Sequence, residues 1–219
     1  MLVDTCNMKG IYFIALITLL LFAGCKEQTD SIHHSFVFVD TTKPFKREIP
    51  TYQDGSGDLF YFVEKAKQKQ LGLDSLENGF SNLQIRVWYD YSLVKQRDLV
   101  VITNKDTNWT ATVYNLQVDW DGETETIISK QVKQVTPKSG WSDFLGKLFD
   151  LKILTLPNMN DIPGLDDGWT DGITYNVEIA TKNQYRFYGY HLPDKFEDKY
   201  WQAKNMTNIL KLFEQEFGV

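Results

Sequence analysis

The chain has 219 residues and a formal net charge of −6 at pH 7, and aromatic residues make up 14% of it, including six Trp. This length suffices for one domain with an extensive core, and each buried aromatic ring would remove roughly 150–250 Å² from water. The mildly acidic balance, without clusters of Lys and Arg in the sequence, argues against nucleic acid as a partner.

The amino end is typical of a signal peptide. Residues 11–23 carry no charge, and a helix of that length is about 20 Å long, shorter than the ~30 Å hydrocarbon core of a bilayer. A buried core helix is also disfavoured, because the run has no polar face. Lys9 provides the positively charged flank of such a signal, and the small residues Ala23 and Gly24 mark its end. Met8 is a better start than Met1, because Asp4 would weaken the positive flank. We therefore expect residues 1–24 to be removed.

Residues 21–25, Leu-Phe-Ala-Gly-Cys, resemble the lipobox of bacterial lipoproteins, although Phe22 stands where Leu, Val or Ile is commoner. The resemblance covers residues 8–25 only. In that class the signal is cut before the cysteine, which is then acylated, so the resemblance implies that Cys25 attaches the protein to a lipid membrane; attachment by more than one acyl chain is stable. The alternative is an ordinary secretory signal followed by an unrelated cysteine. Residues 26–28, Lys-Glu-Gln, resemble the charged stretch that sends some lipoproteins to the outer face of the outer membrane. The resemblance therefore implies a location in the cell envelope, and in its outer membrane rather than its inner membrane.

Residues 25–34 would form the lipidated cysteine and a polar tether, and residues 35–219 a single domain. Cys6 would be removed with the signal and Cys25 acylated, so the mature chain would keep no thiol. This excludes a structural disulfide, a thiol nucleophile and a cysteine-rich zinc site. We identify no family resemblance in the domain itself.

The first part of the domain predicts a strand, a loop and a helix. The strand is expected at residues 36–39 and a proline-bearing loop at 41–57. The helix ends at Gly72. Its apolar residues recur at i, i+3, i+4 and i+7, which predicts that their stripe faces the core; they are Leu59, Phe62, Val63 and Ala66.

The middle of the chain changes to a period of two, which is typical of strands. Strands are expected at residues 83–89, 99–103, 110–120 and 126–128, with a hairpin at Asp121-Gly122. In the first of these strands the odd positions would face the core. The short connections require antiparallel pairing, because none is long enough for a crossover.

The last third predicts a short helix at residues 141–148, strands at 173–179 and 185–187, and an amphipathic C-terminal helix. The C-terminal helix would begin with a capping box at Asp194 and present one apolar stripe as far as Phe217. The fold class is therefore α+β: an antiparallel sheet of about six or seven strands, covered on one face by the terminal helix, with two shorter helices.

Residues 158–172 concentrate acids, glycines and an aromatic residue in one long loop, and loops of that length usually have a function or are disordered. Asp167, Asp171 and Glu178 occupy the first, fifth and twelfth places of the helix–loop–helix calcium pattern. Trp169 at the third place cannot bind a metal, and Glu178 falls in a predicted strand. A solvated turn is therefore favoured over a calcium site, and no metal or cofactor is expected.

Signatures of catalysis are missing from the sequence. It has no nucleophile elbow, no phosphate-binding glycine loop and no zinc-protease helix. The three histidines, His33, His34 and His191, are too scattered for a metal site. An enzyme is therefore not indicated, and a hydrolase that uses the loop at residues 158–172 is the weakest alternative.

Aromatic residues are the remaining candidates for binding. With the odd positions of its strand facing the core, Trp88 would point outward on the opposite face of the sheet, and Trp169, Tyr188 and Tyr190 are further possible ligand-binding residues. The alternative is that both faces are covered and these rings are structural. The sequence thus predicts a cell-envelope lipoprotein with a non-catalytic domain that binds a protein partner; the alternative partner is a glycan stacked on exposed aromatic rings.

Overall fold

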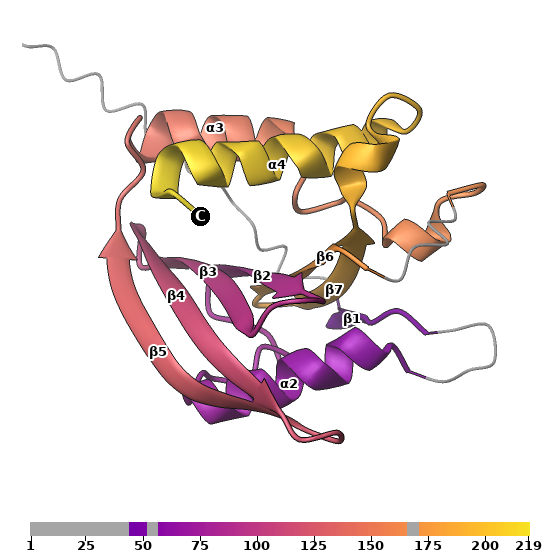
Figure 1. Cartoon of the computed structure of the whole chain (residues 1–219). Coiled ribbons are helices and arrows are strands. Elements are labelled where there is room, and N and C mark those ends of the chain that lie inside the picture. The colour runs from indigo at the N-terminus through magenta and orange to yellow at the C-terminus, as the bar shows by residue number, and fades with distance from the viewer. Residues whose placement is uncertain (1–43, 52–56, 166–170) are drawn as a thin grey trace, which may run out of the picture. The chain divides into compact units, whose positions relative to one another are not determined.

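A seven-stranded sheet, in the order β1-β7-β6-β2-β3-β4-β5, forms the middle layer of the described domain (Figure 1). The computed structural model describes residues 44–51, 57–165 and 171–219, so Cys25 and the predicted strand at residues 36–39 lie outside the described residues. The strands are β1 (Lys46–Glu48), β2 (Leu83–Tyr91), β3 (Gln96–Lys105), β4 (Asn108–Trp120), β5 (Glu125–Val135), β6 (Ile173–Thr181) and β7 (Gln184–His191).

Neighbouring strands of this sheet pair antiparallel, except that β1 runs parallel to β7. β2 lies at the centre, where Leu83 is opposite Asn104 of β3 on one side and Thr181 of β6 on the other. The sheet therefore joins segments that are far apart in the sequence. The predicted α+β class, the number of strands and the antiparallel pairing are confirmed, whereas the short strand β1 was not predicted.

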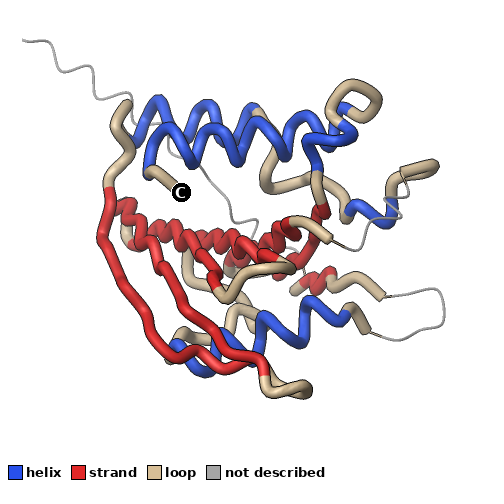
Figure 2. Tube along the Cα trace, in the orientation of Figure 1, coloured by secondary structure: helices blue, strands red, loops and turns tan. Residues whose placement is uncertain are grey.

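In the described residues, three α-helices cover the two faces of the sheet. α2 (Leu59–Leu71) lies on one face, and α3 (Trp141–Asp150) and α4 (Trp201–Phe217) lie on the other (Figures 1 and 2). Two short 3-10 helices, η1 (Met159–Asp161) and η2 (Pro193–Phe196), precede β6 and α4. None of the helices in this part of the chain is long and apolar enough to cross a membrane.

The sheet face under α3 and α4 carries the main hydrophobic core. Leu83, Ile85 and Val87, the odd positions of β2, are fully buried there, as predicted. Phe144 of α3 and Phe213 of α4 belong to the same core, with their ring centroids 5.9 Å apart. Full burial of such a side chain contributes roughly 1.5–3 kcal/mol, so this core fixes both helices on the sheet.

The start of α4 differs from the prediction. Residues Pro193–Phe196 form the separate helix η2, and α4 begins only at Trp201, without a capping side chain. Tyr200 is extended (φ −124°, ψ 118°), and its hydroxyl donates to the carbonyl of Gly164. This extended residue interrupts the helical run, so the predicted capping box at Asp194 does not cap α4.

α2 ends at Gly72 (φ 69°) as predicted, but it packs on the sheet through the opposite face. Leu59 and Phe62 of the predicted core stripe are 63% and 57% exposed. The sheet below α2 carries buried charges, including Arg86 and Glu178, and an unpaired buried charge is costly. The polar side of the helix therefore faces the sheet; its buried residues are Tyr61, Glu64, Lys67, Gln68 and Leu71.

Candidate binding cleft

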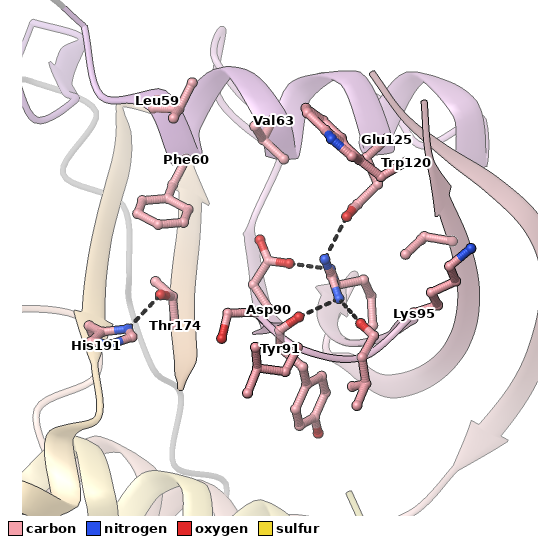
Figure 3. A pocket seen from close by; sticks show the side chains of 15 residues that line it. Leu59, Phe60, Val63, Asp90, Tyr91, Lys95, Trp120, Glu125, Thr174 and His191 are labelled. Atoms are coloured by element: carbon pink, nitrogen blue, oxygen red, sulfur yellow. Dashed lines mark hydrogen bonds and ion pairs between the residues drawn. The ribbon is translucent and has the colours of Figure 1, made fainter. Parts of the chain in front are cut away.

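A cleft of about 570 Å³ lies between α2 and the turn that joins β2 to β3 (Figure 3). We call it the α2 cleft. The helix, the turn and the end of β4 supply its apolar walls, which are formed by Leu59, Phe60, Val63, Leu93, Val94 and Trp120. Concave sites with apolar walls and a few polar groups are typical of ligand-binding sites.

The mouth of the α2 cleft is a patch of exposed apolar side chains. Leu93 is 78% exposed and Trp120 59% exposed, and both line the same cleft as Leu59 and Phe60 of the helix wall. Phe62 of α2 is also exposed, but it does not line the cleft. Single exposed apolar side chains are normal, but contiguous patches mark interaction sites.

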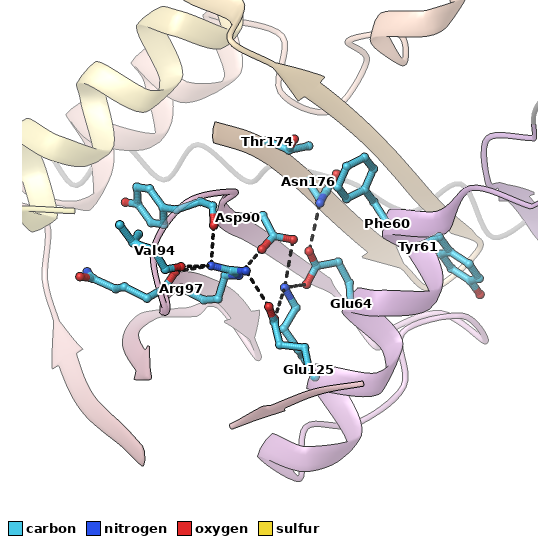
Figure 4. Close-up of polar contacts among 12 residues, drawn as sticks. Phe60, Tyr61, Glu64, Asp90, Val94, Arg97, Glu125, Thr174 and Asn176 are labelled. Carbon is cyan, nitrogen blue, oxygen red and sulfur yellow. Dashed lines mark hydrogen bonds and ion pairs between the residues drawn. The ribbon is translucent and has the colours of Figure 1, made fainter. Parts of the chain in front are cut away.

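Below the cleft, five charged side chains of the described chain meet, and we call them the buried charge cluster: Glu64, Lys67, Asp90, Arg97 and Glu125 (Figure 4). The ammonium of Lys67 contacts all three carboxylates, at 3.1 Å (Glu64), 3.2 Å (Asp90) and 3.5 Å (Glu125). Arg97 pairs with Asp90 and, at 2.6 Å, with Glu125. None of the five side chains is more than 12% exposed, so the cluster joins α2 firmly to β2, β3 and β5.

Arg97 also fixes the turn wall of the cleft. Its Nη1 donates to the carbonyls of Tyr91, Val94 and Gln96, each at 2.7 Å. The planar guanidinium with its five donors suits such a set of acceptors, whereas Lys offers only a point charge. The buried charge cluster therefore positions both the helix wall and the turn wall.

The cluster contains three carboxylates and two cations, and this imbalance affects ionisation. Burial raises the pKa of Glu64 to about 8, with a further contribution from Asp90, although Lys67 and a hydrogen bond from Asn176 (3.0 Å) oppose the shift. Burial disfavours the charged form of Lys67, but the three carboxylates outweigh it and raise the pKa of that ammonium. At neutral pH Glu64 is therefore mainly protonated, and two carboxylates balance the two cations.

Thr174 and His191 lie at the inner end of the cleft (Figure 3). The Oγ1 of Thr174 and the Nδ1 of His191 are 2.9 Å apart and share a hydrogen bond. The Nε2 of His191 is buried and has no hydrogen-bond partner among the described residues.

Glu178 belongs to a second group of charges rather than to a calcium site. It is fully buried on β6, where its carboxylate pairs with Lys65 of α2 and, at 3.4 Å, with Arg86 of β2. Cations of the protein already occupy this carboxylate, which disfavours Glu178 as a calcium ligand. Asp171 is exposed, and Asp167 lies outside the described residues. The described ranges hold no group of three His, Cys, Asp or Glu side chains that could bind a metal ion.

The described ends of the loop at residues 158–172 are tied to the sheet. The side-chain oxygen of Asn158 accepts a hydrogen bond from the backbone N–H of Gly189 at 2.8 Å. At the other end, the N–H of Gly172 donates to the hydroxyl of Ser92 in the β2–β3 turn, also at 2.8 Å. These contacts give both ends a structural role, and the second one supports the turn wall of the α2 cleft.

Trp88, Tyr188 and Tyr190 are buried, which corrects the prediction of an exposed aromatic platform. Trp88 is 1% exposed because α2 covers its face of the sheet and places the Lys67 ammonium 5.6 Å from its ring centroid. Tyr188 and Tyr190 are 1% and 0% exposed and belong to the main core. Trp169 lies outside the described residues.

Sequence reasoning missed the residues of the α2 cleft. The helix carries two stripes at helical spacing, the apolar one at Leu59 and Phe62 and a mainly polar one at Glu64 and Lys67. Periodicity does not tell which stripe faces the sheet. The available signal was Arg86 in the middle of an apolar strand, because a buried charge there requires a charged partner from the covering helix.

Comparisons with known proteins do not assign the chain to a family. No family model, no curated protein and no solved structure gives a significant match to it. A functional proposal therefore depends on the α2 cleft and on the sequence of the amino end.

Proposed function

We propose that the chain is a cell-envelope lipoprotein, attached to the outer membrane through acylated Cys25, whose folded domain binds a protein partner in the α2 cleft and catalyses no reaction. The inverted packing of α2 carries this proposal, because it buries Lys67 on the sheet and leaves Leu59 exposed in the wall of the cleft. The attachment rests on the lipobox resemblance of residues 21–25.

The apolar mouth of the cleft supports a protein partner. Leu59, Leu93 and Trp120 are each more than half exposed. Fully burying a Leu or Phe side chain contributes roughly 1.5–3 kcal/mol, and Trp is enriched among the residues that dominate binding energy at interfaces. Because the buried charge cluster already holds both walls, the cleft would lose little conformational entropy on binding.

The charged groups of the cleft support binding rather than catalysis. Asp90 and Glu125 both pair with Lys67 and Arg97, and Arg97 also donates to three backbone carbonyls. A general acid or base must reach the proton that it transfers, and these groups are engaged with each other instead. Their arrangement suits the positioning of α2 and the turn.

The proposed function is tested by removing the apolar mouth. Tagged full-length protein from detergent-solubilised envelopes should recover a stoichiometric protein partner, and the double variant Leu59→Ser/Leu93→Ser, which removes two exposed side chains of the cleft lining, should lose it. The matched control Ile128→Ser/Val132→Ser removes two side chains of β5 that are 64% and 51% exposed and do not line the cleft, so it should keep the partner. Equal recovery by both double variants would contradict binding in the α2 cleft.

The lipid attachment is tested separately. Mass spectrometry of the purified protein should find cleavage before Cys25 and acyl chains on that residue, and Cys25→Ala should move the protein to the soluble fraction. An unmodified thiol at Cys25 would instead indicate the ordinary secretory signal.

A glycan is the second candidate partner, favoured by the ring of Trp120, which is 59% exposed at the mouth of the cleft. Titration with cell-wall and host sugars should then change the Trp fluorescence of the wild type but not that of Trp120→Ala. A flat response of the wild type across the panel would exclude this candidate.

A further inference from the structure

We infer that the occupant of the α2 cleft is a basic, amphipathic peptide segment of the partner protein, with apolar side chains between the walls and Lys or Arg side chains against the surrounding carboxylates. This inference rests on the proposed function and adds the chemistry of the partner.

The β4–β5 turn, which joins the cleft-lining residues Trp120 and Glu125, is acidic, and we call it the rim of the α2 cleft. Asp119, Asp121 and Glu123 are exposed there, and the exposed cation of the lining, Lys95, pairs with Asp119. The backbone N–H groups of Thr124 (2.7 Å) and Glu123 (2.9 Å) donate to the carboxylate of Asp121 and lower its pKa, so it is ionised at neutral pH. Within the described residues no ion pair neutralises Asp121 or Glu123, so the rim keeps negative charge.

The floor of the cleft adds no net positive charge to this rim. Asp90 and Glu125 line the cleft and are balanced by Lys67 and Arg97, while Glu64 below them is mainly protonated at neutral pH. The donors of Arg97 are already used by carbonyls and carboxylates. A cation that enters the cleft would therefore find uncompensated carboxylates at the rim, on Asp121 and Glu123, which would repel an anion.

Apolar walls within acidic surroundings favour a basic peptide over other occupants. The carboxylates of Asp121 and Glu123 would repel an anionic lipid surface, which attracts Lys- and Arg-rich segments instead. A second copy would bring the same acidic rim against itself, and the whole chain carries a net charge of −6. A segment with apolar anchors and flanking Lys or Arg satisfies both the walls and the charges, as in the recognition of amphipathic helices by apolar grooves.

The test is a selection of random short peptides displayed on phage against immobilised full-length protein in detergent. We expect the selected peptides to combine Phe, Leu or Trp with Lys or Arg, and to lose binding to Leu59→Ser/Leu93→Ser. A synthetic peptide with the selected sequence should bind more weakly as the NaCl concentration rises, because salt screens exposed charges.

A charge variant provides the second arm of the test. Asp121→Asn/Glu123→Gln removes two rim charges, while Asn can still accept the hydrogen bonds of the turn. This variant should weaken binding of the synthetic peptide about three- to tenfold at low salt. The control Asp150→Asn/Asp198→Asn removes two exposed charges at the end of α3 and before α4, the helices on the opposite face of the sheet from α2 (Figure 1), and it should leave the affinity unchanged.

The outcomes separate the inference from the function beneath it. Selected peptides that are neutral or acidic but still require Leu59 and Leu93 would overturn the inference and leave the proposed function standing. Failure to select any peptide that depends on these two residues would overturn both. Binding to phosphatidylglycerol vesicles that is lost in Leu59→Ser/Leu93→Ser would overturn the inference in favour of a membrane surface.

Discussion

At the scale of single residues, Glu64 makes the stability of the domain depend on pH. Its carboxyl group is fully buried, and its pKa is raised from 4.5 to about 8. Between these two values the folded chain keeps a proton that the unfolded chain has released, so the stabilisation is full below the lower value and is lost as the pH rises through about 8. We expect Glu64→Gln, which cannot ionise, to abolish this loss in urea unfolding measured from about pH 5 to about pH 9.

A matched variant controls for the general effect of pH on unfolding. Glu197→Gln removes a half-buried carboxylate that pairs with Lys211 at 3.4 Å, and it should keep the pH dependence of the wild type. If Glu64→Gln also kept it, Glu64 would be ionised in the folded chain and balanced by Lys67.

Arg97 combines a charge with a donor geometry that Lys lacks. We expect Arg97→Lys to lower the free energy of unfolding by about 2–4 kcal/mol, because several of its carbonyl and carboxylate acceptors would lose their donors. Hydrogen exchange should also become faster at residues 91–96, the turn that Arg97 holds. The control substitution Lys211→Arg, at the surface, should change the free energy of unfolding by less than about 0.5 kcal/mol. Unchanged exchange at the turn in Arg97→Lys would mean that the turn needs no guanidinium.

At the scale of elements, the packing of α2 predicts which of its residues tolerate substitution. Phe62→Ser should lower the free energy of unfolding by less than about 1 kcal/mol, because the ring is already 57% exposed. Lys67→Met should cost about 3–5 kcal/mol, because it leaves the buried carboxylates without their ammonium. Urea unfolding measures both. The reverse order of the two effects would mean that the apolar stripe faces the sheet.

The elements that the sequence predicts well show one clear period of apolar residues, even where both faces are buried, as in β2. The strand at residues 83–89 and the helix at 141–148 follow from apolar residues at a single period. The face that α2 buries is decided instead by Arg86 and Glu178, which are adjacent only because β2 pairs with β6. The α2 cleft also combines a helix, a turn and a strand end that no local pattern connects. The three residues of β1 are too few to show an alternation.

At the scale of the whole domain, the two faces of the sheet are held by different interactions. α2 buries two large apolar side chains, Tyr61 and Leu71, and otherwise depends on charged and polar contacts. Buried ion pairs largely offset their own cost of desolvation, so they add little net stability. α4 is held by apolar burial, through Ala203, Met206, Ile209, Leu212 and Phe213.

We therefore expect α2 to open locally before α4. In hydrogen exchange followed by mass spectrometry, residues 59–71 should exchange faster than residues 201–217 once intrinsic rates are corrected for, because local openings need less free energy where few apolar contacts are lost. The difference should grow above about pH 8, where Glu64 ionises and leaves the buried charge cluster with excess negative charge. A basic peptide bound in the α2 cleft should slow exchange at residues 59–71 specifically. Equal protection of both helices at every pH would mean that the charge cluster holds α2 as firmly as the apolar core holds α4.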